Sequence, residues 1–243
     1  MLRSLSIVIP AYNEEKRIPQ TLEQVMAYLE SRRFDFHEVI VVNDGSKDRT
    51  AAVVKQAAAK WPSLRLLENP GNHGKGYSVR HGMLAAKGEW VLFSDADLSA
   101  PIEELPKLER EAERQSAAVA IGSRALDRSL IGVHQSAFRE TAGRFFNLVM
   151  RALIGLPFWD TQCGFKLFRA DAARQVFQRT RQERFGFDVE SLFIARMHRF
   201  KTVEVAVRWN HADGTKVSMF KDSADMFLDL LRVRWNQMRG MYR

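Results

Sequence analysis

Cysteine and long apolar runs are scarce in this sequence of 243 residues. Its only cysteine, Cys163, cannot form an intramolecular disulfide, which excludes a disulfide-stabilised fold of the secreted type. A membrane-spanning helix needs about 18 consecutive apolar residues. The best candidate, residues 148–159, is shorter and contains Arg151 and Pro157. We therefore expect any membrane contact of this chain to be peripheral.

The amino-terminal residues also lack the pattern of a signal peptide. The first apolar run is short, and Glu14 and Glu15 follow it closely, where a signal peptide would have a small-residue cleavage site. We expect the mature chain to begin at Met1 in a reducing cytoplasm.

What is present is the composition of a basic globular protein. Hydrophobic residues make up 46% of the chain, which is ordinary for a folded domain and excludes a disordered or collagen-like chain. The 37 Lys and Arg residues outnumber the 29 Asp and Glu residues, so the formal net charge is +8. This balance favours phosphate-bearing partners, whether nucleic acid, nucleotides or an anionic membrane, and does not choose among them.

Short apolar strands alternate with helical patterns along the first half of the chain. The predicted strands are residues 5–9, 38–42, 64–68, 90–94 and 117–122, and the predicted helices are residues 18–29, residues 46–60 with a Ser46 cap, and a helix opened by Pro101. The alternation predicts an α/β fold with a largely parallel central sheet and flanking helices. Ligands of such sheets bind at the carboxyl ends of the strands, where we expect the functional residues.

The carboxyl-terminal segment differs from the rest of the chain. Residues 220–243 combine apolar side chains such as Trp235 with basic ones such as Arg239 at helical spacing. Helices of this kind lie on membranes or on partner domains. We therefore divide the chain into a main domain, residues 1–219, and a basic amphipathic helix, residues 220–243, which we expect to contact a membrane surface.

Polar turns follow the first two predicted strands. Residues 10–14 read Pro-Ala-Tyr-Asn-Glu and residues 43–46 read Asn-Asp-Gly-Ser. Each segment alone is a common turn. Together they indicate a nucleotide pocket, in which Asp44 accepts a hydrogen bond from a base and the following helix N-terminus attracts phosphate.

A lysine between glycines and a pair of aspartates follow further along. Gly74 and Gly76 flank Lys75 and would let the backbone approach an anion, although the spacing is not that of a Walker A loop. Asp95 and Asp97 end the next strand and offer carboxylate oxygens to a hard cation such as Mg²⁺ or Mn²⁺. A lone pair of this kind is often a solvated turn, but its place in a series of strand-end motifs favours a metal site.

In this order, these segments resemble the inverting family-2 glycosyltransferases of GT-A fold. Residues 160–168, Asp-Thr-Gln-Cys-Gly-Phe-Lys-Leu-Phe, narrow the resemblance to the dolichyl-phosphate β-glucosyltransferases, relatives of the dolichyl-phosphate mannose synthases. Residues 122–124, 187–190 and 209–216 extend it over nearly the whole chain. The resemblance implies metal-dependent transfer of glucose from UDP-glucose to a polyprenyl phosphate at the cytoplasmic face of a membrane.

The resemblance also implies roles for individual residues. The nucleotide sugar would be bound by Pro10, Tyr12, Glu14, Asp44, Lys75, Gly76, Asp95 and Ala96, and the Mg²⁺ or Mn²⁺ ion by Asp95 and Asp97. The acceptor phosphate would be held by Arg124, Arg139 and Lys216, which with Asp97 form the catalytic set, and a loop beneath the sugar would include Asp160, Gln162 and Gly164. Ser99 stands where the mannose synthases carry a glutamine metal ligand, which weighs against mannose as the sugar.

Other interpretations stay open on the sequence alone. Asp188 and Glu190 are either general bases for a hydroxyl acceptor or acids that favour a helix N-terminus. Mannose or another sugar, or a glycan hydroxyl as acceptor, are alternatives within the same enzyme class. A non-catalytic nucleic-acid-binding module would explain the net charge, but acids cluster at the strand ends and no nucleic-acid-binding motif occurs. We therefore expect no nucleic-acid partner.

Overall fold

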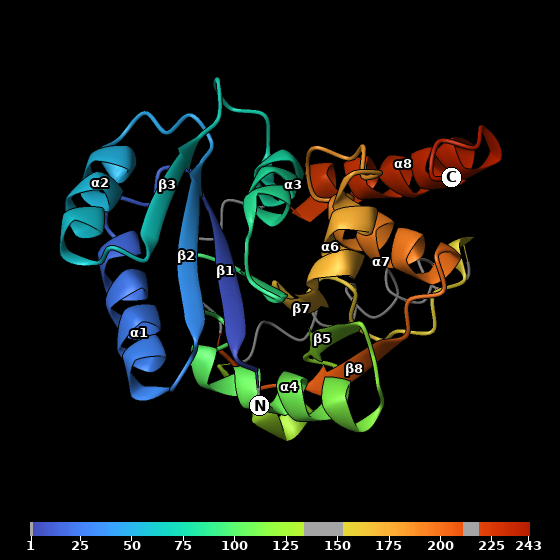
Figure 1. Cartoon of the computed structure of the whole chain (residues 1–243). Helices are drawn as coiled ribbons and strands as arrows, with labels where there is room; N and C mark the ends of the chain where they lie inside the picture. Colours follow the sequence, from blue (N-terminus) through green and yellow to red (C-terminus); the bar gives the residue numbers. More distant parts are fainter. Residues whose placement is uncertain (1, 134–152, 211–218) are drawn as a thin grey trace.

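The computed structural model describes residues 2–133, 153–210 and 219–243. Its centre is a seven-stranded sheet in the order β3-β2-β1-β4-β7-β5-β8 (Figure 1). The strands are β1 (Ser4–Ala11), β2 (Phe36–Asn43), β3 (Leu64–Glu68), β4 (Trp90–Ser94), β5 (Val119–Ser123), β7 (Phe165–Arg169) and β8 (Thr202–Ala206). All neighbours in this sheet pair in parallel except β7, which runs antiparallel to both β4 and β5. A small sheet pairs β6 (Ile131–Val133) with β9 (Trp209–Asn210).

Helices cover both faces of the large sheet, as Figure 1 shows. They are α1 (Ile18–Ser31), α2 (Thr50–Lys60), α3 (Lys75–Ala85), α4 (Leu105–Arg114), α6 (Ala170–Phe177), α7 (Phe187–Met197) and α8 (Met219–Met238), with short 3-10 turns at Ile102–Glu104 and Arg128–Leu130. Residues of α1, α2 and α4 share one hydrophobic core, and residues of α3, α6, α7 and α8 share the other. The fold is therefore a three-layer α/β arrangement.

Side-chain alternation along the strands supplies both cores. Ile7 and Ile9 of β1 pack in the core that contains α1, whereas Val8 between them packs in the core that contains α3. At Gly82 helix α3 comes so close to β1 that a Cβ atom would lie 2.3 Å from Val8 Cγ1. This close contact seats α3 against β1, and Lys75 is the first residue of that helix.

The structure confirms the α/β class and the mostly parallel sheet, and it corrects two local predictions. The helix expected from Ser46 begins at Thr50, because the Ser46 hydroxyl accepts a hydrogen bond from Asn13 N at 2.9 Å and Asp48 Oδ1 accepts one from Thr50 N at 3.0 Å. Residues 161–168, expected as a loop next to Asp160, contain β7 from Phe165 onward. Both faces of this strand are buried, so its sequence does not alternate between apolar and polar residues as that of a half-exposed strand does.

Helix α8 lies beside α7 at the side of the molecule, where Figure 1 draws it in red. Leu230 and Val233 on its inner face and Tyr242 after its end are buried. None of the helices in the described ranges combines the length and the apolar character needed to cross a membrane. The division of the chain at residue 219 stays a prediction.

Candidate active site

The loops after β1 and β2 are joined by hydrogen bonds at the carboxyl edge of the sheet. Lys47 N donates to Asn13 Oδ1 at 2.8 Å, and Glu14 N donates to Thr50 Oγ1 at 2.8 Å. Pro10 lies at the end of β1, with Tyr12 and Glu14 in the loop that follows, and all three are half-buried. The predicted nucleotide-binding loop is therefore built as one unit with the amino-terminal end of α2.

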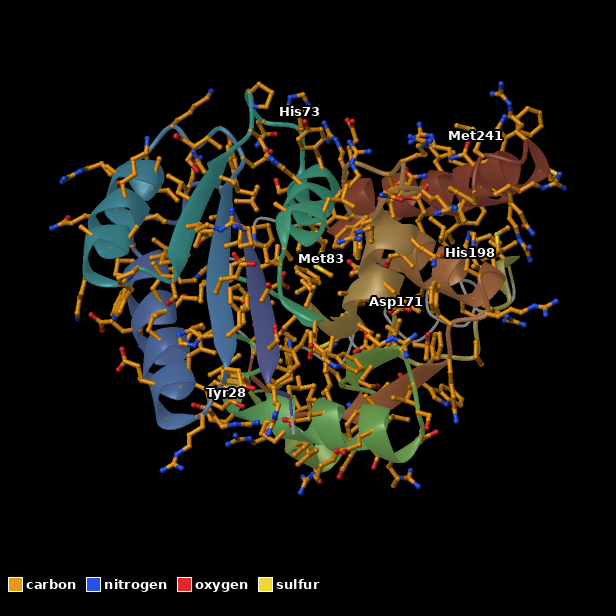
Figure 2. The ribbon with its side chains drawn as sticks, viewed as in Figure 1. Tyr28, His73, Met83, Asp171, His198 and Met241 are labelled. Carbon is orange, nitrogen blue, oxygen red and sulfur yellow. The ribbon has the colours of Figure 1, made fainter. Side chains whose placement is uncertain are left out.

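Asp44 organises the neighbouring loop. Its carboxylate is buried, and it accepts hydrogen bonds from Asn69 Nδ2 at 2.8 Å, His73 N at 3.0 Å and Gly74 N at 2.8 Å. Figure 2 shows His73 above α3, where its ring stacks on that of Tyr77 at a centroid distance of 4.5 Å. Asp44 thus shapes the turn that leads to Lys75, and its predicted contact with a base stays a prediction.

The glycines around Lys75 meet protein backbone. A Cβ on Gly74 would lie 2.5 Å from Glu183 O, and one on Gly76 would lie 2.5 Å from Gln182 O. These glycines therefore let the loop of residues 181–186 pack against the start of α3. The approach of this backbone to an anion stays a prediction.

Lys75 and Asp95 form an ion pair at the end of β4. Lys75 Nζ lies 2.6 Å from Asp95 Oδ1, and each side chain keeps about a quarter of its surface exposed, at 26% and 28%. Asp95 N donates to Gly164 O at 3.0 Å, and a Cβ on Gly164 would lie only 1.9 Å from Asp95 Oδ2. Glycine is therefore the one residue type at position 164 that leaves room for the Asp95 carboxylate in this orientation.

Burial and neighbouring charges shift the pKa of both partners. Burial raises the pKa of Asp95, and Lys75 only partly offsets that effect. Burial alone would lower the pKa of Lys75, but the carboxylates of Asp95 and Asp188 outweigh it and raise the Lys75 pKa above its ordinary value. Lys75 is thus a cation at neutral pH.

Asp97 stands beside this pair in a tight turn. Its Oδ1 accepts a hydrogen bond from Ser99 N at 2.9 Å, and Leu98 between them has a left-handed backbone conformation with φ 45°. The carbonyl of Ala96 accepts a hydrogen bond from Thr21 Oγ1 at 2.5 Å. Carboxylate oxygens from two half-buried aspartates are the hard ligands that Mg²⁺ and Mn²⁺ take, and such ions complete their shells with water and substrate phosphate. The donor set thus fits a divalent ion, although no group of three or more His, Cys, Asp or Glu side chains within the described ranges could hold one alone.

Arg124 and Asp160 form a second ion pair at the edge formed by β5. Arg124 Nε and Nη2 donate to the Asp160 carboxylate at 2.6 and 2.8 Å, and Gln162 N donates to Asp160 Oδ1 at 3.1 Å. Burial alone would raise the pKa of Asp160, but Arg124 outweighs it and holds that pKa at about 2. The Arg124 guanidinium also lies over the Trp209 ring, 5.4 Å from its centroid. Asp160 thus fixes the orientation of the predicted acceptor arginine.

An ion pair that was not predicted from the sequence lies beneath the site. Lys166 of β7 pairs with Asp188 in the first turn of α7, and its Nζ also donates to Cys163 O at 2.7 Å. Glu190 accepts hydrogen bonds from Arg181 N and Gln182 N, both at 2.8 Å, and from the Tyr242 hydroxyl at 2.6 Å. These contacts occupy both acids, which favours the structural interpretation over a pair of general bases. A lysine inside an apolar run, in Phe-Lys-Leu-Phe, was the available signal.

The single cysteine and two predicted phosphate-binding residues remain to be placed. Cys163 is buried, and burial raises the pKa of its thiol to about 12, which agrees with a packed residue and not with a nucleophile. Arg139 and Lys216 lie outside the described residues, so their part in binding the acceptor phosphate stays a prediction.

The family model and the similar proteins that match this chain agree with one another. Residues 6–177 match the family model described as Glycosyl transferase family 2. The chain is 40% identical over 239 residues to a dolichyl-phosphate beta-glucosyltransferase of Trichomonas vaginalis, covering 94% of this chain and 72% of the relative. It is 37% identical over 254 residues to the dolichyl-phosphate beta-glucosyltransferase of Homo sapiens, covering 99% and 78%.

Solved structures share the fold at lower identity. The glucosyl-3-phosphoglycerate synthase of Mycobacterium tuberculosis, crystallised with Mn²⁺, UDP-glucose and phosphoglyceric acid, superposes with a TM-score of 0.64 at 18% identity, covering 95% of this chain and 79% of that one. The mannosyl-3-phosphoglycerate synthase of Rubrobacter xylanophilus gives a TM-score of 0.62 at 18% identity, covering 98% and 74%. These likenesses confirm the GT-A fold.

Proposed function

Because this chain belongs to glycosyltransferase family 2, we propose that it transfers glucose from UDP-glucose to a polyprenyl phosphate of the dolichyl type, with a divalent cation as cofactor. The relatives named above support the glucosyl group and the lipid phosphate. The Mn²⁺ and UDP-glucose in a structure of the same fold support the cofactor and the donor.

The observation that carries the proposal is that the deeper acidic side chains at the carboxyl edge of the sheet already pair with cations of the protein. Asp160 and Asp188 are each paired with a cation inside the protein, Arg124 and Lys166. A hydroxyl acceptor needs a free carboxylate to remove its proton. A phosphate monoester is already ionised near neutral pH and needs none, so a lipid phosphate suits an edge whose deeper acids are already paired.

The reaction is a single displacement at the anomeric carbon of the sugar. An oxygen of the acceptor phosphate forms a bond to that carbon, the bond to the β-phosphate oxygen of the donor breaks, and the bonding electron pair leaves with UDP. No proton needs to move. Attack from the face opposite the leaving group inverts an α-linked donor into a β-linked product.

The chain's own residues position and neutralise the reacting groups. Lys75 lies at the start of α3, where its ammonium can leave its ion pair with Asp95 and bind the diphosphate of the donor instead. Arg124, held by Asp160, presents a rigid guanidinium toward the acceptor side. Asp95 and Asp97 would hold the divalent ion, which when bound stabilises the charge that grows on the leaving diphosphate.

Helix α8 supplies a surface for the membrane that carries the lipid acceptor. The exposed apolar residues on its outer face are Phe227, Leu228, Leu231, Trp235 and Met238. Trp235 is 58% exposed and Met238 is 72% exposed. Arg232 lies next to this face on the helical wheel, and Arg239 follows the last residue of the helix. Cations beside an apolar stripe complement an anionic leaflet. We place the enzyme on the cytoplasmic leaflet as part of the proposal.

A donor screen tests the proposal directly. Purified protein is incubated with Mn²⁺, vesicles containing polyprenyl phosphate, and UDP-glucose, UDP-galactose or GDP-mannose in parallel, and lipid-linked sugar is quantified. We expect UDP-glucose to give most of the product, in β linkage, and polyprenol without its phosphate to give none. Transfer from GDP-mannose alone would replace the sugar in the proposal, and absence of lipid-linked sugar with every donor would overturn it.

A further inference from the structure

A lysine side chain is buried in the core beneath the site. Only 1% of the Lys166 side chain is exposed, and its neighbours along β7 are Phe165 and Leu167, both fully buried. Taking an ammonium and a carboxylate out of water is costly, and an apolar pair of similar volume often stabilises a fold at least as well. The pair of Lys166 and Asp188 therefore calls for an explanation beyond stability.

The explanation lies in a second ammonium on the same aromatic ring. Lys166 Nζ lies 5.6 Å from the centroid of the Phe93 ring, and Lys75 Nζ lies 5.4 Å from the same centroid. Lys75 pairs with Asp95 on the exposed side of this cluster. Asp188, the partner of Lys166, also acts electrostatically on Lys75. Charges of opposite sign thus alternate from Asp95 through Lys75 and Asp188 to Lys166.

We propose that Lys166 is a positioning residue, which pairs with Asp188 so that Lys75 stays available to Asp95 and to the diphosphate of the donor. A buried carboxylate without a counter-ion attracts the nearest cation. For Asp188 that cation would be Lys75, whose flexible four-carbon stem would let it turn away from the site. The inference rests on the proposed function, because it assigns Lys75 to a nucleotide-sugar donor.

The proposal predicts an asymmetry that a purely structural pair would not produce. In Lys166→Met, Asp188 loses its cation and captures Lys75, so the affinity for UDP falls roughly tenfold, as expected when one charge-assisted contact is withdrawn. In Asp188→Asn, no anion competes for Lys75, and the affinity for UDP stays within about twofold of wild type. The double variant Lys166→Met with Asp188→Asn removes both charges and restores the affinity.

Isothermal titration with UDP measures these affinities without turnover, in the presence of Mn²⁺ and again in chelator, with thermal unfolding recorded for every variant. Arg32→Met is the matched control. Arg32 pairs at 3.0 Å with Glu109, another buried carboxylate, which also accepts a hydrogen bond from Leu2 N near the start of the chain. We expect this control to lower the melting temperature and to leave the affinity for UDP unchanged.

The outcomes separate this inference from the proposed function. A tenfold loss in Lys166→Met that the double variant reverses supports the positioning role. Equal losses in the two single variants, or a double variant that stays weak, overturn it. If Lys166→Met does not fold, Asp188→Asn decides, because a loss of UDP affinity there contradicts the proposal. Wild-type protein that binds UDP while Lys166→Met binds it equally well overturns this inference alone, whereas wild type that binds no UDP overturns the proposed function with it.

Discussion

At the scale of single residues, the site depends on how closely groups of opposite character approach one another. Asp95 touches Lys75 on one side and lies where a side chain at residue 164 would begin on the other. Such contacts tolerate little displacement, because moving a catalytic group by about 1 Å can lower the reaction rate roughly a hundredfold. Small substitutions are therefore the sharpest probes of this edge.

Gly164→Ala should inactivate the enzyme without unfolding it. The added methyl would overlap the Asp95 carboxylate, so that this side chain must leave the position in which it pairs with Lys75. We expect the transfer rate to fall by roughly a hundredfold, measured as lipid-linked glucose formed per folded molecule. Gly88→Ala is the matched control, since its Cβ would meet Ser6 N at 2.6 Å next to the amino-terminal start of β4. Equal rate losses in both variants would contradict the role given to Gly164.

The Asp160 carboxylate should give the fold a specific dependence on pH. Its pKa in the folded protein is about 2, below the ordinary value of 3.8, so the ionised form stabilises the fold. This contribution is fully present above about pH 4 and is lost as the pH falls toward 2. It amounts to about 2 kcal/mol, from the size of the shift.

Urea unfolding of wild type and Asp160→Asn between pH 5 and pH 3 measures the contribution of ionised Asp160 to the free energy of unfolding. We expect the free energy of unfolding to fall more steeply with decreasing pH in wild type than in the variant. Parallel curves would contradict the assignment of the low pKa to Asp160.

At the scale of elements, helix α8 has one face that packs against the core and an opposite face that is exposed. Its inner face buries Leu230 and Val233 against the core, and its outer face carries exposed apolar side chains. Deleting the helix would therefore damage the core as well as any lipid contact. Point substitutions on one face at a time separate the two roles.

Replacing Leu231 and Trp235 with glutamate should detach the protein from lipid while leaving its fold intact. Both residues lie on the outer face of α8 and are about half exposed. Each loses apolar burial in the bilayer of about 1.5 kcal/mol or more, so we expect binding to anionic vesicles to weaken by at least tenfold. Vesicle sedimentation measures it. Val233→Ala on the inner face is the control, which should lower the melting temperature and keep binding; unchanged binding in the glutamate variant would contradict the membrane surface.

The carboxyl terminus should stabilise the loop that closes over the start of α3. Tyr242→Phe removes the hydroxyl that donates to Glu190, the same carboxylate that accepts from Arg181 N and Gln182 N. A lost hydrogen bond to a buried carboxylate costs about 2 kcal/mol. We expect lower stability in urea and faster hydrogen exchange at those two amides.

Tyr28→Phe is the control for this variant. Figure 2 labels Tyr28, whose hydroxyl accepts from Arg32 Nη1 at 2.8 Å in a partly exposed position. It should cost less stability and leave exchange at the loop amides unchanged. Equal exchange in wild type and Tyr242→Phe would remove the link between the terminus and this loop.

At the scale of the whole molecule, regular local patterns were predictable and contacts across the chain were not. The strands at residues 64–68 and 90–94 coincide with β3 and β4, because apolar runs bounded by turns mark buried strands. The antiparallel strand β7 was not predicted, because its pairing with β4 and β5 is set by residues far away in the sequence. Strand pairing between residues so far apart in the chain leaves no pattern in the local sequence.

The site follows the same rule. The gathering of Asp44, Lys75, Asp95 and Asp97 at one edge follows from their positions after strands. The pairing of Lys166 with Asp188 and of Arg124 with Asp160 joins residues 22 and 36 positions apart, and only the fold reveals it. Sequence order thus identifies the residues of the site, and tertiary contacts decide which of their charges are still available.

We propose that Asp97 and Asp95 hold a divalent ion, and that the glucosyl transfer needs this ion. The most direct test of this proposal is the rate of radiolabelled glucose transfer from UDP-glucose to polyprenyl phosphate by wild type and Asp97→Ala, each with Mn²⁺ and with chelator. We expect wild type with Mn²⁺ to form lipid-linked glucose at least a hundredfold faster than the other three reactions, on the order of the loss when preorganised charge stabilisation is removed. Equal rates for Asp97→Ala and wild type, or a wild-type rate unchanged by chelator, would contradict the account.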